Sequence, residues 1–510
     1  MVLNKLLDAS SSRRLQLVEV LLSDDTWWTI DELSQQLMCS GRTIRADIQY
    51  YNSNLTSEIT IETSKKRGIK LTTSNDFQME KIYQRAMENS LNFQIIKKLF
   101  ELDIPSIEDL AELLYTSISS IIRSLKQINS FLAEYNLWVQ SKPVKIRGSE
   151  KQIRYFYSVF LWDYYSAAFD EFQHPFLEIA NKYIYLLQEK AKEPFYSPLT
   201  QHKTALWLVI CLERIKKGYI IEENYELPDF EVIKINQLFD SLSAELPFAI
   251  PKKDRKFMIY LYQNFYWQFY IELLSSDSLL TKLYENVRDF IETLKERTGY
   301  TLENQEDLIV ILMSFYFYRG LFKGGSHILL NRSRNLLNSL KPIFSVFPRV
   351  VKDVLNKGPD NRWTRKAKEN EEEIIFMMIT SWKGLTSQVI QEKERIQLVV
   401  MSQQGWRHEL FLIDLLEARY PFVLKSYAFT EAIYQEDKVQ MILTDCQVEL
   451  TKKWMAPDIK VIGIETVPSQ RDWKKIQQEI DIILLNQQTR ICDGAEGTNS
   501  HQKEGKGKHA

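Results

Sequence analysis

Three side chains between positions 42 and 49 carry hydrogen-bond donors that could read double-stranded DNA. Arg42, Arg45 and Gln49 fall on one side of a helix at 100° per residue. Arginine pairs with guanine, and glutamine with adenine, through two hydrogen bonds in the major groove. We therefore expect base recognition from this face, with Thr43 as a further DNA contact.

A second cationic cluster follows soon afterwards. Lys65, Lys66 and Arg67 lie in the segment SKKRG, between Ile59–Glu62 and Ile69–Leu71, which alternate like two short strands. A winged helix lays such a basic hairpin tip on DNA phosphates, which fixes its register without reading sequence. We expect these three cations to bind phosphate.

The elements that must position these side chains form a helix-turn-helix. Thr29, with Glu32 three residues later, makes a capping box that starts a short amphipathic helix. After the break at Met38–Gly41, Ser40 can cap a second helix, and Ser10–Leu22 supplies a supporting first helix. One apolar stripe of the second helix must face a core: Ile44, Ile48, Tyr51 and Leu55.

An ordinary three-helix domain is the alternative, because it too would have an amphipathic helix with arginines outward. No single feature excludes it. The succession of cap, short turn, long helix and basic hairpin favours a DNA-binding module.

The same pattern recurs about 77 residues later, where Ser106–Leu132 repeats the capping and apolar positions of Thr29–Leu55. KPVKIRG at Lys142–Gly148 supplies a second basic hairpin arm. Arg123 and Lys126 are candidate DNA contacts on the outward side of this module. Other outward positions differ from those of the first module, so the second module either touches DNA differently or mainly supports the first. Ser119 and Ile122 stand there in place of Arg42 and Arg45.

Composition indicates several packed domains in a reducing compartment. A chain of 510 residues is expected to hold roughly three to five domains. The formal charge of −2 excludes binding of nucleic acid by bulk charge, so contacts must come from local patches. Four cysteines without a CxxC pair give no disulfide or zinc pattern.

Neither a membrane segment nor a catalytic signature stands out. The longest apolar run, Leu308–Tyr318, is too short to span a bilayer, and the first residues lack the apolar core of a signal peptide. No HExxH, GxSxG or Walker pattern occurs. We expect a cytoplasmic protein that is not an enzyme and that uses no cofactor, metal or membrane.

The residue composition and the predicted secondary structure change twice along the rest of the chain. From Lys151 to about Ile390 it consists of long aromatic-rich helical segments, enough for two bundles whose aromatic stripes form the cores. From Arg395 onward, buried strands alternate with helices at Trp406–Arg419 and Ser469–Ile480, which predicts a small α/β domain with a parallel sheet. The tail from about Arg490 is predicted to be disordered.

With this domain order, and with RTIRADI and SPLTQHKTALWLVICLERI, the chain resembles the Mga and AtxA family of Gram-positive virulence regulators across nearly its whole length. The resemblance implies that the bundles are PRDs, modules that receive phosphate on histidine from the sugar phosphotransferase system. It also implies that the last domain is similar to enzyme IIB of that system.

Two histidines become regulatory candidates through this resemblance. His202 lies near the start of a helix, where the family's first PRD presents its phosphorylated histidine. His327 is the histidine of the second bundle, and neighbouring Gly324 and Gly325 favour its exposure. A histidine that only solvates or caps a helix is the alternative for each, because phosphoryl transfer needs an accessible imidazole.

The last domain departs from enzyme IIB at its reactive position. Ser402 stands about where that enzyme carries the cysteine that takes phosphate, and bulky Trp406 and charged Arg407 follow it. A serine hydroxyl is a poor phosphate acceptor without a base. We expect a former phosphocarrier retained for assembly, the alternative being a serine that still senses an anion.

The predicted fold is multidomain and mainly α, with two winged helix-turn-helix modules, two PRD-like bundles and an enzyme-IIB-like α/β domain. The expected segments are 1–78, 79–150, 151–278, 279–390, 391–489 and the tail 490–510. The predicted function is a dimeric DNA-binding transcriptional regulator, an activator, controlled by histidine phosphorylation. Its expected partners are promoter DNA, a second copy and the phosphocarrier protein of the phosphotransferase system, with RNA polymerase as a candidate.

Two other functions are alternatives for this chain. A phosphocarrier without DNA binding would need the cysteine that Ser402 replaces. RNA antitermination, also performed by PRD proteins, would need a small β-rich domain at the start, where this chain has helices. The operator and the sign of each phosphorylation do not follow from the sequence.

Overall fold

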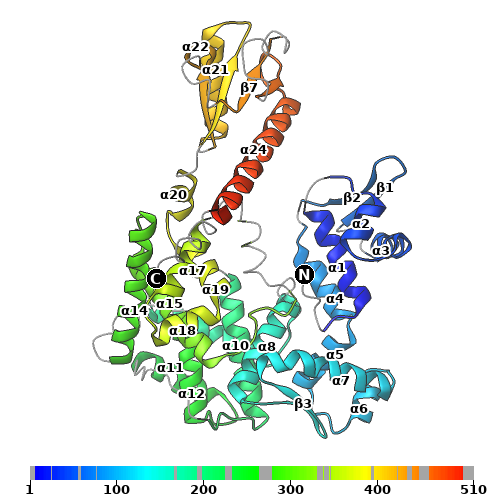
Figure 1. Cartoon of the computed structure of the whole chain (residues 1–510). Coiled ribbons are helices and arrows are strands. Elements are labelled where there is room, and N and C mark those ends of the chain that lie inside the picture. The colour runs from blue at the N-terminus through cyan, green and yellow to red at the C-terminus, as the bar shows by residue number, and fades with distance from the viewer. Residues whose placement is uncertain are drawn as a thin grey trace, which may run out of the picture. The chain divides into compact units, whose positions relative to one another are not determined.

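In the computed structural model the placement of most residues is defined (Figure 1). The described residues are 6–23, 26–54, 59–75, 77–165, 169–191, 198–223, 233–263, 278–329, 337, 340, 344, 346–391, 395–421, 423–432, 439–446 and 459–497. The chain divides into two units, one of Met1–Thr281 with Met313–Arg332 and one of Lys282–Leu312 with Ser333–Ala510. Both units are mainly helical, as predicted.

The first module has the predicted helix-turn-helix with a hairpin. Thr29 and Glu32 form the expected capping box, in which the Thr29 amide donates to the Glu32 carboxylate at 2.7 Å. Ser40 caps the following helix by accepting from the Thr43 amide at 3.2 Å. The elements are α1 (Ala9–Leu22), α2 (Ile30–Gln36), α3 (Gly41–Asn54), β1 (Ile59–Ser64) and β2 (Gly68–Thr73).

Buried polar contacts fix α3 against its neighbours. Asp47, whose side chain is 1% exposed, accepts hydrogen bonds from Arg13 at 2.7 Å and Arg14 at 3.0 Å, both on α1. Asn52 exchanges two hydrogen bonds of 3.0 Å with the backbone of Ile61 on β1. With Ile44, Ile48 and Tyr51 in the core, the opposite side of α3 faces outward.

The second module repeats the first in its hydrogen bonds as well as its apolar positions. Ser106 and Ser117 cap its two helices, as Thr29 and Ser40 do in the first module. Asn129 accepts from the Val139 amide at 2.6 Å, where Asn52 holds β1. The elements are α4 (Met79–Glu88), α5 (Leu91–Glu101), α6 (Ile107–Leu113), α7 (Ile118–Leu132), η1 (Ala133–Tyr135), β3 (Trp138–Ser141) and β4 (Val144–Arg147).

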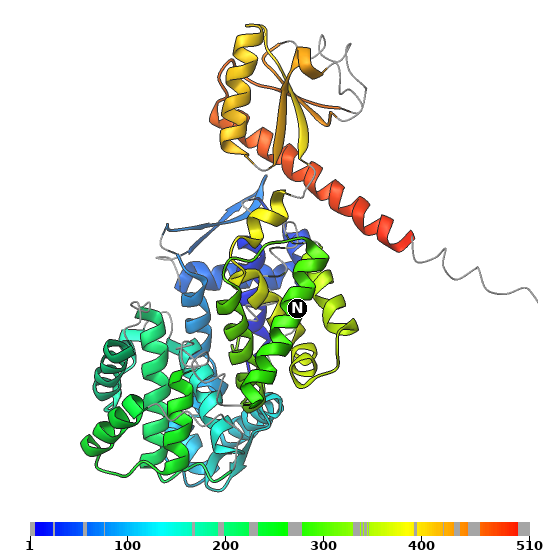
Figure 2. The ribbon, with the colours of Figure 1, turned by 90° about the vertical axis from the view of Figure 1, so that its left-hand side faces the viewer.

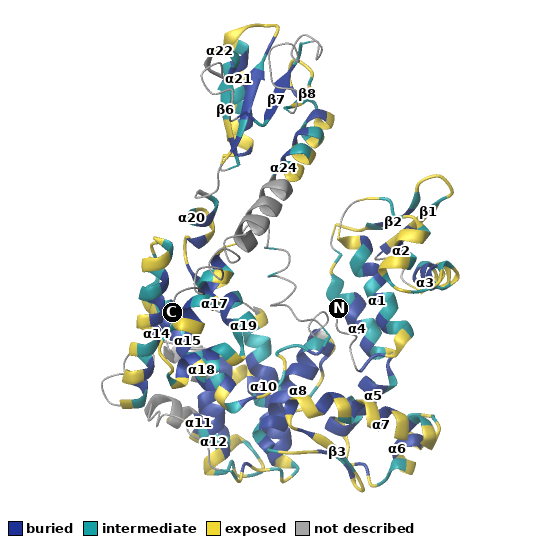
Figure 3. Cartoon of the chain, viewed as in Figure 1, coloured by how far each residue is buried: buried dark blue, intermediate teal, exposed yellow. Residues whose placement is uncertain are grey.

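A helical bundle with an aromatic core continues this unit. Tyr155 is buried and stacks on Phe322 at 4.6 Å between ring centroids, and Figure 3 shows α8 and α10 as largely buried. The fully buried Arg154 pairs with Glu150 and Asp254, and Arg214 pairs with Glu150 at 2.6 Å. The elements are α8 (Glu150–Tyr165), η2 (Phe169–Glu171), α9 (Leu177–Ala191), α10 (Pro198–Lys216), α11 (Ile233–Glu245) and α12 (Lys252–Gln263).

The other unit holds a second group of helices, also packed on aromatic side chains. Trp363 is fully buried and donates its indole hydrogen to the Leu312 carbonyl at 3.3 Å. Two of the described helices run across the division between the units, α14 at Thr281 and α15 at Leu312. The helices are α14 (Ser278–Thr298), α15 (Gln305–Leu321), α17 (Phe347–Lys357), α18 (Arg362–Glu369), α19 (Glu371–Ser381) and α20 (Leu385–Gln391).

The C-terminal part contains the predicted parallel sheet, with strand order β6-β5-β7-β8. Figure 2 shows α21 packed along the sheet and α24 leading away from it. α24 continues through Gly497 and so includes the first residues of the predicted tail, while 498–510 lie outside the described residues. The elements are β5 (Ile396–Met401), α21 (Trp406–Arg419), β6 (Leu424–Ala428), α22 (Phe429–Ala432), β7 (Met441–Thr444), β8 (Lys460–Gly463) and α24 (Gln470–Gly497).

None of the described helices combines the length and the apolar character that a membrane crossing requires.

Candidate nucleic-acid interface

The outward side of α3 presents the predicted base-reading residues. Arg42, Arg45 and Gln49 are exposed, and neither arginine forms an ion pair with a described residue. Thr43 differs, because its hydroxyl lies 2.9 Å from the Ser40 hydroxyl within the helix cap. The two arginines and Gln49 are therefore free to meet a duplex, while Thr43 is half-buried and shapes the start of the helix.

The hairpin between β1 and β2 presents the predicted phosphate-binding cations. Lys65, Lys66 and Arg67 are all exposed at its tip. Gly68 follows with a φ of +102°, and a Cβ there would lie 2.2 Å from the Trp28 carbonyl oxygen. Trp28 and Ile69 also exchange backbone hydrogen bonds of 2.8 and 2.7 Å. The hairpin is thus tied to the segment before α2, and glycine is required for that close approach.

The second module presents a different outward side. Arg123 and Lys126 are exposed on α7 as predicted, and neither forms an ion pair with a described residue. Ile118 and Ile122 are 45% and 55% exposed on the same helix. The cations can reach phosphate, but Ile122 provides no hydrogen-bond donor where the first module has Arg45, and Ser119 stands where it has Arg42.

The second basic hairpin does not present all of its cations outward. Lys145 is half-buried, with its ammonium 5.3 Å from the centre of the Tyr219 ring, beyond α10. Burial, together with nearby Arg147 and Arg214, lowers the pKa of Lys145. The expectation of a simple basic arm was therefore wrong at Lys145, because β4 packs against the bundle.

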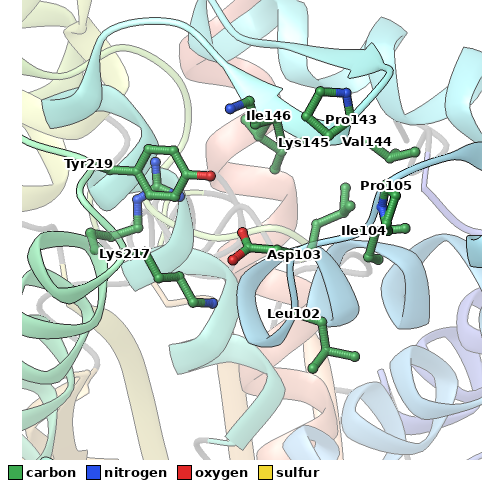
Figure 4. A pocket seen from close by; sticks show the side chains of 12 residues that line it. Leu102, Asp103, Ile104, Pro105, Pro143, Val144, Lys145, Ile146, Lys217 and Tyr219 are labelled. Carbon is green, nitrogen blue, oxygen red and sulfur yellow. The ribbon is translucent and has the colours of Figure 1, made fainter.

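A cavity of about 390 Å³ lies where this hairpin meets the bundle. Figure 4 shows Tyr219 and Lys217 on one side and the hairpin residues Pro143–Ile146 on the other, with Asp103 between them. Lys217 donates to the Phe100 carbonyl at 2.7 Å, which ties α10 to the last turn of α5. The bundle and the second reading module therefore share a contact surface.

His202 lies in the second turn of α10, near the helix start as expected, but it is only half-exposed. Its ring stacks on Phe169, with centroids 4.4 Å apart and planes inclined by 10°. The accessible imidazole that the sequence suggests is thus covered on one face by an aromatic ring.

His327 is placed differently from the expectation. Its side chain is 15% exposed, and Nδ1 lies 2.9 Å from the Asp163 carboxylate on α8. The residue belongs to the unit of the first bundle, in the stretch Met313–Arg332. The adjacent glycines do not expose it, because Asp163 also accepts from the Ile328 amide at 2.6 Å and closes the loop onto α8.

The loop before His327 also touches the second reading module. The Gly325 carbonyl accepts from the hydroxyl groups of Tyr135 at 3.0 Å and Tyr155 at 2.9 Å. A Cβ at Gly324, whose φ is +87°, would lie 2.5 Å from the Tyr135 ring. Tyr135 follows α7 directly, so the loop, α8 and the second module are joined at one point.

Ser402 sits in a closed hydrogen-bond cluster that the sequence analysis did not foresee. Its hydroxyl donates to Asp445 at 3.0 Å, and the Gln403 amide donates to the same carboxylate at 2.7 Å. His408 Nδ1 lies 2.7 Å from the Ser402 oxygen. Which of the two atoms donates in that contact depends on the tautomer of His408.

This cluster bears on whether the domain could carry phosphate. An imidazole that could act as a base lies beside Ser402, and the Asp445 carboxylate accepts a hydrogen bond from the same hydroxyl. The Gln403 amide, in the loop after β5, donates to the carboxylate of Asp445. The described residues contain no group of three or more His, Cys, Asp or Glu side chains placed to hold a metal ion.

Both helix-turn-helix modules match domain models of known protein families. Residues 13–70 match a helix-turn-helix domain model, and residues 75–161 match the Mga helix-turn-helix domain model. The chain is 24% identical to the capsule synthesis positive regulator AcpB of Bacillus anthracis, over 92% of this chain and 98% of that protein.

Two further relatives from the same organism are also named as positive regulators. The capsule synthesis positive regulator AcpA is 27% identical over 60% of this chain and 65% of its own length. The anthrax toxin expression trans-acting positive regulator is 24% identical over 41% of this chain and 44% of its own length. These relatives are regulators and not enzymes. With two helix-turn-helix domains and related regulators along most of its length, the chain is similar to the Mga and AtxA type of virulence regulators.

Proposed function

We propose that this chain activates transcription by binding double-stranded promoter DNA through α3 and the hairpin that follows it. The observation that carries the proposal is a set of exposed cations that form no ion pair with a described residue and lie on a helix and a hairpin tip of one module: Arg42, Arg45, Lys65, Lys66 and Arg67. The names of the relatives, which are positive regulators, support activation. The second module adds contacts through Arg123 and Lys126.

Control by phosphorylation is the second part of the proposal. The phosphocarrier protein of the sugar phosphotransferase system would donate a phosphoryl group to His202 and His327. At His327 the hydrogen bond from Nδ1 to Asp163 leaves Nε2 as the nucleophile. The new nitrogen–phosphorus bond forms as the one on the donor breaks, so the group is transferred without another reactant.

A phosphoryl group at His327 would act through the loop that carries it. It brings about 1.5 to 2 negative charges close to the Asp163 carboxylate, and like charges at this distance repel. That repulsion weakens the closure of the loop, and with it the hydrogen bond from Tyr135 to the Gly325 carbonyl. The second module would then change its position relative to the bundle.

A homodimer completes the proposal, with RNA polymerase as a candidate partner. One winged helix reads a short site, and two-fold symmetry is the usual way to lengthen it. The α/β domain exposes apolar side chains that suit an interface, with Trp406 54%, Phe411 44% and Val467 58% exposed. The Gln403 amide after its first strand is already bound to the Asp445 carboxylate, which favours assembly over phosphate transfer.

Binding of the full chain to promoter fragments, followed by fluorescence anisotropy with and without competitor DNA, tests the main proposal. We expect specific binding that weakens steeply as salt rises. Equal affinity for promoter and unrelated duplexes would reject it.

Labelling tests the regulatory part separately. The phosphorylated carrier protein should label the wild type with acid-labile phosphate, and the His202→Ala, His327→Ala double variant should take up none. His174→Ala serves as the matched control, because His174 is another bundle histidine and should leave labelling unchanged. Absence of label in the wild type, or its survival in the double variant, removes these two histidines from regulation.

A phosphocarrier without DNA binding is the alternative function. It would require a reactive group at position 402, where the Ser402 hydroxyl is instead held by Asp445.

A further inference from the structure

The outward side of α7 carries an apolar surface where a reading helix normally carries polar groups. Ile118 and Ile122 are one helical turn apart and are 45% and 55% exposed. They occupy the positions of Gly41 and Arg45 in the first module. We call this pair, together with Tyr115, the apolar reading face.

Tyr115 extends this face from the turn before α7. It is 98% exposed and has a φ of +50°, a backbone conformation that side chains other than glycine rarely adopt. Met38 has the same φ at the equivalent turn of the first module and is 94% exposed. The turn geometry therefore holds a large apolar side chain outward in both modules, which costs stability without giving any packing in return.

Cations border the apolar reading face on the same helix. Arg123 and Lys126 are exposed beside it, and neither pairs with a described acidic residue. Their charge complements a phosphate backbone on either side of a groove. A protein partner would have to bury these charges at a cost, whereas duplex DNA satisfies them.

We propose that the apolar reading face recognises thymine through its 5-methyl group in the major groove. Isoleucine cannot hydrogen-bond to base edges, and thymine is the base that carries a methyl group there. The proposal rests on the DNA-binding function proposed above and extends it. The first module reads bases by hydrogen bonds, and the second selects thymine by apolar contact.

Replacing thymine by uracil, which lacks only the methyl group, tests this directly. The full chain is titrated against duplexes carrying the protected promoter site, with single dT-to-dU exchanges along the segment covered by the second module. We expect wild-type affinity to fall about fourfold for each contacted methyl group, the value for burying one methyl-sized group. The Ile118→Ala, Ile122→Ala variant should bind dT and dU duplexes equally.

The Arg45→Ala variant is the matched control, because it weakens binding through the first module but should keep the full dU penalty in the segment covered by the second module. Equal wild-type affinity for dT and dU duplexes would overturn the proposal. So would a penalty that persists in the double isoleucine variant, or isoleucine variants that keep normal DNA affinity but lose a protein partner. A wild type without any specific DNA binding would overturn the proposed function as well, and the two failures are thereby distinguished.

Discussion

At the scale of single residues, the cations of the first module should divide into two kinds. Arg42→Ala or Arg45→Ala removes a candidate base contact and should cost roughly 1 to 3 kcal/mol of specific binding. Lys65→Ala, Lys66→Ala or Arg67→Ala should weaken binding to all sequences alike and lower the salt slope by about one unit per contact. Binding isotherms at four salt concentrations measure both effects.

Lys182→Ala provides the charge-matched control for these variants. Lys182 is 54% exposed on α9 and pairs with Glu245, so its removal should leave DNA affinity and salt slope unchanged. If all five cation variants behave like this control, α3 and its hairpin do not form the interface.

Ser402 gives a second prediction at this scale. Ser402→Ala removes the hydroxyl that donates to Asp445, whose side chain is 2% exposed. Leaving a buried carboxylate with fewer donors should cost about 1 to 3 kcal/mol in the α/β domain. Amide hydrogen exchange of β5 and β7 in the full chain should accelerate accordingly, while phosphate labelling stays as in the wild type. Loss of label in this variant would instead show that Ser402 carries phosphate.

The placement of side chains that depends on local spacing along a helix could be predicted from the sequence. Placement that depends on a partner distant in the sequence could not. Arg42, Arg45 and the Thr29 cap follow from local rules. The partner of His327 is Asp163, more than 160 positions away, and its burial depends on that contact. Asp445, which is distant from Ser402 in the sequence, was missed for the same reason, whereas His408, six positions after Ser402, was an available signal.

At the scale of elements, the N-terminal cap of α1 makes a pH prediction. Asp8 is partly buried, which raises its pKa, but hydrogen bonds from Ser10 and Ser11 outweigh this and bring the value to about 2, below the usual 3.8. A depressed folded-state pKa gives stability that is present above about pH 4 and lost as pH falls toward 2. Asp8→Asn keeps a cap without the charge.

The difference in thermal midpoint between wild type and Asp8→Asn should therefore shrink as pH falls from 5 to 2. A difference that stays constant over this range would mean that the Asp8 carboxylate does not titrate with folding.

Helices and strands could be predicted well because capping residues, apolar periodicity and turn residues are local. The trajectory of the second hairpin could not, because it depends on packing. Lys145 looks like any exposed cation in KPVKIRG, yet it lies against Tyr219 once β4 meets the bundle. The same limit applies to α24, where the polar composition that suggested disorder is compatible with a helix as far as Gly497.

At the scale of the whole molecule, the sequence predicted the helix-turn-helix modules near the start and the parallel sheet near the end. It did not predict which helices belong to the same unit. The second half of α15 and the loop with His327 belong to the unit of the first bundle, although they are distant from it in sequence. Only contacts such as that between His327 and Asp163 reveal this grouping.

The proposed dimer gives a prediction at this scale. The full chain should be a dimer at micromolar concentration, and a chain ending at residue 390 should dimerise more weakly, because it lacks the exposed apolar side chains of the α/β domain, such as Trp406. Light scattering over a range of concentrations measures both. Monomers in both cases would reject a dimer, and equal dimers would place the interface outside the α/β domain.

Hydroxyl-radical footprinting of a bound promoter tests the central claim, that two repeated modules each contact duplex DNA. The wild type should protect two adjacent patches within each half-site. The Arg42→Ala, Arg45→Ala variant should lose protection in one patch, and the Arg123→Ala, Lys126→Ala variant should lose it in the other, while Lys182→Ala protects both. A wild-type footprint that neither double variant changes would contradict the claim.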